Sequence, residues 1–138
     1  RAYNREMQAP INPKKNDGEY PHVDYALARR RILRDFRRGI LTTLDVCDAH
    51  PELIRVATNH PSPTDRDCPI CADKDTQNYL VEVSYLYGTK LGKGSGRPVT
   101  EYNQLEIADK AGKSFQRYLV EVCISCKWNF LVRREDHN

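Results

Sequence analysis

Hydrophobic residues in the second half of the chain follow the two-residue alternation of β-strands. Residues 79–87 are rich in aromatic and β-branched side chains and partly alternate with polar ones, and residues 115–122 and 128–132 have the same character. The pattern therefore predicts three strands. Six aromatic residues could stack nucleic-acid bases, but we expect them to form the core of so small a sheet: Tyr79, Tyr85, Tyr87, Tyr118, Trp128 and Phe130.

The segment between the first two strands has a different composition. Residues 88–98 contain four glycines, two lysines and one arginine, which predicts a basic loop. The loop lacks the spacing of a nucleotide-binding P-loop. Thr100 then caps a short helix that extends to about residue 110, with Leu105 and Ile107 as its buried contacts. We expect the loop and this helix to form an insertion between strands.

In the first half of the chain, hydrophobic residues recur at helical spacing. Asp24 can cap a first helix that Gly39 ends. Further short helices are predicted from Thr42, which begins a sequence similar to a capping box, and from Pro51, which suits a first helical position. Three short helices predict a small bundle. A helix-turn-helix reader of DNA is the second interpretation, because the third helix offers few side chains suited to base edges.

Residues 1–23 show neither a helical nor a strand period. They contain three prolines, several asparagines and two adjacent lysines, Lys14 and Lys15, which is the composition of an extended arm. An arm of this kind becomes ordered when it lies on another molecule. We therefore predict an extended N-terminal arm that contributes to binding.

Four of the five cysteines form two pairs with two residues between the thiols. Cys68 and Cys71 are the first pair, and Cys123 and Cys126 are the second. In such a turn both sulfurs point to one place, so two turns complete a tetrahedron around Zn²⁺. The 51 residues between the pairs exceed the spacing of compact zinc fingers, so an insertion must lie inside the site. We predict a structural zinc ion held by these four cysteines.

Disulfides and thiol redox chemistry are the alternatives for these cysteines. Disulfides would imply an oxidising compartment, but no stretch has the apolar core of a secretory signal or the roughly 20 apolar residues of a membrane span. A thioredoxin-like motif would need a βαβ setting. We therefore expect a cytoplasmic protein with metal-bound thiolates.

The fifth cysteine, Cys47, is separated from His50 by two residues. One interpretation is a third pair of metal ligands, since His can replace Cys on zinc. The simpler interpretation is favoured: Cys47 is a small buried apolar residue, and His50 lies at a helix start just before Pro51.

The formal net charge of +3 is distributed unevenly. Residues 1–38 contain ten Lys or Arg and five Asp or Glu, whereas residues 39–138 contain twelve and fourteen. Six arginines lie on the first predicted helix, balanced only by Asp35, which favours a face that binds phosphates or an acidic protein surface over a solvated face. The candidate binding residues are Arg29, Arg30, Arg31, Arg34, Arg37, Arg38, Lys14, Lys15, Lys93 and Arg97.

Together these patterns predict an α+β fold. Its expected parts are an extended arm at 1–23, a helical segment at 24–60 with an Arg-rich first helix, and a zinc-ribbon domain at 61–138 with an insertion at 88–114. The proline-rich residues 60–65 are predicted to be a linker. The order strand, cysteine pair, strand is typical of a zinc ribbon, in which the metal lies at one end of a small antiparallel sheet.

The chain also resembles a known family. Residues 46–53, the two cysteine pairs, residues 120–123 and residues 126–129 are similar to those of an uncharacterised family of small actinobacterial proteins. The resemblance covers about residues 24–133 and leaves the arm outside it. It implies a bacterial cytosolic protein with a zinc ribbon, and it brings no established activity.

Three classes of function remain. An enzyme is disfavoured, because zinc held by four cysteines has no open position and the four histidines show no catalytic spacing. We expect a non-enzymatic accessory factor that docks on bacterial RNA polymerase or its sigma factor and modulates transcription. The alternative is a ribosome-associated or hibernation factor that binds rRNA through the arm and the Arg-rich helix, although the modest net charge counts against it. We expect neither a membrane nor a small-molecule substrate as a partner.

Overall fold

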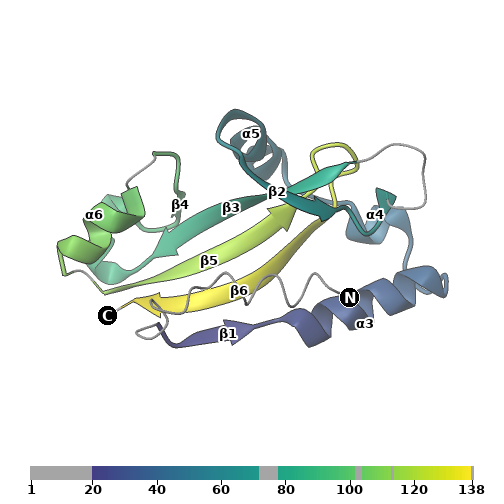
Figure 1. The fold of residues 1–138 in the computed structure, drawn as a ribbon, viewed down its shortest axis with the longest axis horizontal. Helices are drawn as coiled ribbons and strands as arrows, with labels where there is room; N and C mark the ends of the chain where they lie inside the picture. The colour runs from purple at the N-terminus through teal and green to yellow at the C-terminus, as the bar shows by residue number, and fades with distance from the viewer. Residues whose placement is uncertain (1–19, 72–77, 102–103, 113, 138) are drawn as a thin grey trace.

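The fold is a mixed arrangement of helices around one antiparallel sheet, seen in a computed structural model that describes residues 20–71, 78–101, 104–112 and 114–137 (Figure 1). The α+β class is therefore confirmed. The strands are β1 (His22–Asp24), β2 (Ser62–Asp67), β3 (Tyr79–Tyr87), β4 (Arg97–Pro98), β5 (Phe115–Val122) and β6 (Asn129–His137). The helices are α3 (Ala26–Arg37), α4 (Thr43–Val46), α5 (Pro51–Asn59), α6 (Gln104–Lys110) and the 3₁₀ segment η2 (Thr89–Gly94).

The strands pair in the spatial order β1-β6-β5-β3-β2, and β4 pairs with β3 outside that path. β3 and β5 have the predicted bounds, whereas β6 continues five residues past the predicted end at residue 132, to His137. β5 and β6 are joined by the loop that carries the second cysteine pair. A pair of long strands therefore ends at the cysteines.

The position of β2 corrects the prediction that residues 60–65 form a linker. Residues from Ser62 onward form a strand at the edge of the sheet, where Pro63 lies opposite Val81 of β3. Proline has no N–H to donate, and an edge strand tolerates this because one of its sides has no partner strand. The proline content therefore indicated an edge position and not a loop.

The predicted signals mark the end of α3 and the starts of α4 and α5, whereas α6 begins at Gln104 and not just after Thr100, which was expected to cap it. The Asp24 carboxylate accepts a hydrogen bond from the Ala26 N–H at 2.6 Å, and Gly39 takes a φ of +81° just after α3. A left-handed φ of this kind is typical of a residue that ends a helix. The predicted capping box forms at α4, between Thr42 and Asp45. Local sequence therefore determines where α3 ends and where α4 and α5 begin.

α3 and α5 lie on opposite sides of the sheet (Figure 1). Successive residues of a strand point to opposite faces. Leu80 of β3 packs in one cluster with Leu33 of α3, and Val83 packs in another with Val56 of α5. The helices thus use the sheet as their packing partner, and the predicted arrangement of a separate bundle beside a ribbon is not confirmed.

The sheet also includes the end of the predicted N-terminal arm. β1 includes the last residues of the predicted arm and pairs with β6, with Val23 opposite Arg134. No helix in the described ranges is long and apolar enough to cross a membrane.

The predicted core residues divide into buried and exposed ones. Trp128 is fully buried, as expected, but Tyr79 and Tyr87 are each about half exposed at 49% and 42%. Ile107 of α6 is 58% exposed, so the expectation that it is buried was wrong. Tyr79 and Tyr87 are the first and last residues of β3, and no residue of α6 is buried, so these side chains remain in contact with solvent.

Candidate functional site

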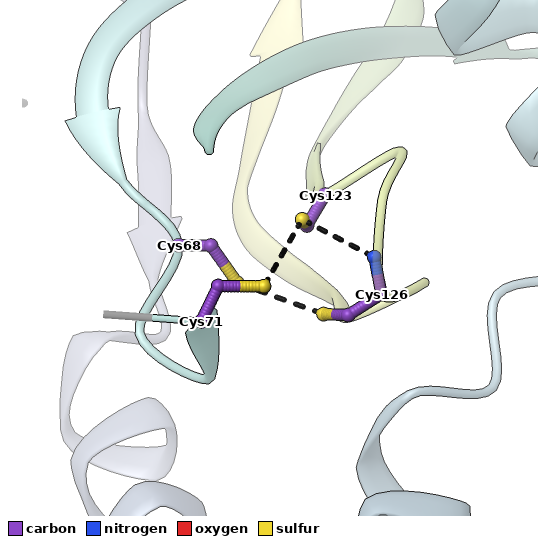
Figure 2. A group of neighbouring side chains, drawn as sticks. All are labelled: Cys68, Cys71, Cys123 and Cys126. Carbon is purple, nitrogen blue, oxygen red and sulfur yellow. Dashed lines mark hydrogen bonds between the residues drawn. The ribbon is translucent and has the colours of Figure 1, made fainter. Parts of the chain in front are cut away.

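The four paired cysteines meet at one end of the sheet (Figure 2). Cys68 and Cys71 lie in the turn after β2, and Cys123 and Cys126 lie in the loop between β5 and β6. All four Sγ atoms lie within 4.8 Å of one another, with 3.7 Å between Cys68 and Cys126 and 3.9 Å between Cys71 and Cys123. The two pairs, 51 residues apart in sequence, form one cluster that could hold a metal ion.

Backbone groups of the two turns point at the sulfurs. The Ile70 N–H donates to Cys68 Sγ at 3.4 Å, and the Cys126 N–H donates to Cys123 Sγ at 3.5 Å. Lys127 adopts a φ of +75°, and its N–H donates to the Cys123 carbonyl at 2.8 Å, which closes the second turn. Donors aimed at sulfur stabilise the thiolate form that a metal ion requires.

The electrostatics of the cluster favour one thiolate over several when no cation is present. The hydrogen bond with Cys68 lowers the pKa of Cys123 to about 5. The same hydrogen bond, together with burial, raises the pKa of Cys68. Thiolates this close repel one another, so a full set of four requires a cation among them.

The four cysteines of the cluster differ in how deeply they are buried. Cys68, Cys71 and Cys123 are buried, whereas Cys126 is only partly buried. Around them pack Leu80 and Trp128, among other apolar residues. The site therefore lies in the hydrophobic core and opens toward solvent at Cys126.

Cys47 lies beside this cluster without belonging to it. Its Sγ is 3.6 Å from Cys126 Sγ, and burial raises its pKa, so the thiol keeps its proton and donates to Cys126. Cys47 is partly buried and packs against the apolar core, which agrees with the simpler prediction in part. His50 instead accepts the Glu52 N–H through Nδ1 at 3.1 Å and caps α5.

A buried ion cluster next to the cysteines escaped the sequence analysis. The Glu121 carboxylate of β5 is fully buried and accepts from Arg29 Nε at 2.7 Å, from Arg66 Nη1 at 3.1 Å and from Trp128 Nε1 at 2.8 Å. Arg66 also pairs with Glu82. The sequence contained one signal: Glu121 stands alone among apolar residues of a strand, at a position that faces away from Val120 and Val122.

The predicted arginine face is confirmed as exposed except at one position. Arg29 is 5% exposed and pairs with Glu121, so its assignment to the binding face is corrected. Its place in the helix turns it toward the sheet, where a buried carboxylate compensates its charge. The exposed residues, which we call the arginine surface, are Arg30, Arg31, Arg34, Arg37 and Arg38.

The other predicted binding residues do not join the arginine surface. Lys93 in η2 and Arg97 in β4 are exposed, near the end of β3 where Leu86 pairs with Arg97. α3 packs near the other end of β3, beside Leu80. Lys14 and Lys15 lie outside the described residues. The exposed candidate binding residues in the described part of the chain therefore form two separate surfaces.

Comparisons with known proteins identify relatives without a known function. The chain is 37% identical over 111 residues to the uncharacterized protein Rv0049 of Mycobacterium tuberculosis (strain H37Rv) and to the uncharacterized protein Mb0050 of Mycobacterium bovis. Each alignment covers 80% of this chain and 77% of the relative. No solved structure matches the chain. A family model described as a family of unknown function (DUF5318) matches residues 18–135, and the chain therefore belongs to this family.

Proposed function

We propose that the metal ion is Zn²⁺ and that Cys68, Cys71, Cys123 and Cys126 hold it as a structural ion. Zinc sites of this type use four thiolates at about 2.3 Å, and a regular tetrahedron with that radius places the sulfurs about 3.8 Å apart. The distances of 3.7 Å and 3.9 Å between sulfurs of different pairs support this assignment. A bound ion would join the turn after β2 to the loop between β5 and β6.

The same geometry supports a non-enzymatic role. Four cysteine ligands complete the coordination of zinc and leave no position for a water molecule or a substrate. Two of the histidines have structural partners: His50 caps α5, and His137 contacts Asp109 and Glu135. We therefore propose that the protein acts by binding a partner and not by catalysing a reaction.

The arginine surface is the binding site that we propose. Its five arginines project from α3 and the residue that follows it, and among the ion pairs of the described residues only Arg34 has a partner, Asp35, at 3.5 Å. Exposed arginines without a fixed counter-ion can form bidentate hydrogen bonds with carboxylates or phosphates. This concentration of uncompensated arginine on one helix is the observation that carries the proposal.

The helix that carries the arginine surface packs on the core around the proposed metal site. The opposite side of α3 contributes Ile32, Leu33 and Phe36 to the core cluster that contains all four cysteines. Arg29 fixes the same helix to Glu121. A structural ion would thereby hold the arginine surface in one orientation, which reduces the entropy that a partner must overcome on binding.

We propose an acidic protein as the partner, specifically RNA polymerase or its sigma factor, on which the protein docks to modulate transcription. Leu27 is 56% exposed and lies three and four residues before Arg30 and Arg31, on the same side of α3. Ile40 and Leu44 beyond the helix are also exposed, at 64% and 86%. Apolar side chains beside arginines are typical of protein interfaces, whereas a nucleic-acid backbone requires charge alone.

The test is an affinity pull-down of the tagged, metal-loaded protein from a nuclease-treated lysate, with mass spectrometry of the captured proteins. Recovery of RNA polymerase subunits or a sigma factor, decreasing as salt is raised, would support the proposal. Recovery of ribosomal proteins alone would overturn it in favour of a ribosome-associated role.

Two triple variants show which surface binds. Arg30, Arg34 and Arg37 are changed to Ala in the first, and Lys90, Lys93 and Arg97 in the second, so that both lose three exposed positive charges. We expect only the first variant to lose the partner. Equal capture by wild type and the first variant would exclude the arginine surface.

A further inference from the structure

We propose that Cys47 and Cys126 form a peroxide-sensitive pair, in which oxidation joins the two sulfurs as a disulfide and releases the metal ion. This inference rests on the proposed zinc site. The two Sγ atoms lie 3.6 Å apart, and a disulfide bond of about 2.05 Å would require them to approach by roughly 1.5 Å. Cys126 therefore has two potential partners: the metal ion that it binds and the Cys47 sulfur, with which it can form a disulfide.

Hydrogen bonds hold Cys47 beside the second cysteine pair. The Ala49 N–H donates to the Lys127 carbonyl at 3.0 Å, and Asn129 Nδ2 donates to Asp48 Oδ1 at 3.0 Å. The residues just after Cys47 are thus bonded to residues just after Cys126. One hydrogen bond between backbones and one between side chains therefore hold the two cysteine-bearing segments side by side.

Solvent exposure makes Cys47 and Cys126 more accessible to an oxidant than the other three cysteines. Cys68 and Cys123 are 0% exposed and Cys71 is 4% exposed, whereas Cys47 and Cys126 are only partly buried. A small oxidant in solution therefore reaches the outer two sulfurs first. Susceptibility of thiols to oxidation follows thiolate character and access, and Cys126 as a metal ligand has both.

The chemistry balances with hydrogen peroxide as the oxidant. The Cys126 thiolate attacks one peroxide oxygen, the O–O bond breaks, and a sulfenic acid forms with loss of hydroxide, which solvent protonates to water. Cys47 sulfur then attacks the sulfenic sulfur; the S–O bond breaks, and the departing hydroxide takes the Cys47 proton as water. Two sulfurs are oxidised by two electrons in all, and peroxide is reduced to two waters.

Loss of Cys126 would leave three ligands for the ion. Thiolate ligation contributes to the stability of such small domains, so release of the metal weakens the core. That core includes Ile32 and Phe36 of α3. Oxidation would thereby loosen the helix that carries the arginine surface, which makes the pair a means of controlling partner binding.

The experiment uses the full chain loaded with zinc under reducing conditions, desalted and treated with hydrogen peroxide. Metal release is followed with a chromogenic zinc chelator, and samples are alkylated, digested and mapped by mass spectrometry. We expect a peptide pair linked through Cys47 and Cys126 that appears together with free zinc. A first disulfide between Cys123 and Cys126, with Cys47 alkylated, would overturn the inference.

The Cys47→Ser variant is the matched control, because it removes the sulfur and keeps the size of the side chain. We expect it to bind zinc like wild type and to release it several-fold more slowly under peroxide. Equal release rates would also overturn the inference. The zinc content of the untreated protein tests the metal assignment separately: a chain without zinc would refute the site, while the disulfide map would still report on the sulfur pair.

Discussion

Arg29 of α3 and Glu121 of β5 form a buried ion pair although 92 residues separate them in sequence. Arg29 Nε lies 2.7 Å from Glu121 Oε2, the same oxygen that accepts Trp128 Nε1 at 2.8 Å. Trp128 follows the second cysteine pair and packs in the core cluster that contains the cysteines. The pair therefore fixes the orientation of the arginine-bearing helix relative to the cysteine cluster.

Replacement of Glu121 by Ala should destabilise the fold strongly. Arg29 and Arg66 would both lose this buried carboxylate while keeping their charges, with Glu82 still paired to Arg66, and breaking one partner of a buried pair costs about 3–5 kcal/mol. Urea unfolding followed by circular dichroism measures the change. The control is Glu52→Ala, which removes an exposed carboxylate paired with Arg55 and should change stability little. Similar effects of the two changes would contradict the role of Glu121.

Neighbouring arginines of α3 should differ sharply in their effect on stability. Arg29→Ala leaves the buried Glu121 carboxylate with one cation fewer, which predicts a loss of several kcal/mol in unfolding free energy. Arg30→Ala changes an exposed side chain and should remain within about 0.5 kcal/mol of wild type. The two melting curves provide the measurement. A marked loss of stability in Arg30→Ala would show that the arginine surface has a structural role.

Removal of the metal should unfold the end of the sheet that carries the cysteines. We expect a strong chelator, or the Cys123→Ser change, to lower the melting temperature and abolish zinc binding, because thiolate ligation supplies folding free energy in small domains. Calorimetry and metal analysis measure both quantities. Cys47→Ser is the control and should retain the ion. An unchanged melting profile in the chelated protein would refute the structural role of the metal.

Glu135 should make stability depend on pH in the acid range. Burial alone would raise its pKa, but the hydrogen bond with His137 and the charges of Arg117 and Arg133 outweigh it and lower the pKa to about 2, from an ordinary value of 4.5. The ionised carboxylate therefore stabilises the fold fully above about pH 4.5, and this contribution is lost as the pH falls toward 2.

The Glu135→Gln variant tests this dependence. It should be less stable than wild type at neutral pH, and the difference should disappear as the pH approaches the lowered pKa. Comparing the two proteins at each pH cancels the acid-induced loss of metal that both share. Glu106→Gln on α6 is the control, because the Glu106 side chain is 66% exposed. A difference that stays constant with pH would contradict the proposed ionisation.

Much of the local structure was predictable because its causes are local. The capping box at Thr42, the proline at the start of α5 and the glycine after α3 each act within a few residues. The same is true of the cysteine pairs, because two residues between thiols direct both sulfurs to one point. Strand alternation likewise predicted the bounds of β3 and β5.

The sequence by itself determined the metal-ligand candidates, the α+β class, the bounds of β3 and β5 and the starts of α4 and α5, because spacing and capping depend on neighbours along the chain. The tertiary structure alone decided that α3 and α5 lie on opposite faces, that Pro63 belongs to an edge strand and that Arg29 is buried. It also brought Cys47 to Cys126. These relationships join residues far apart in sequence, and they depend on how the strands pair and which face each helix covers, which no local pattern specifies.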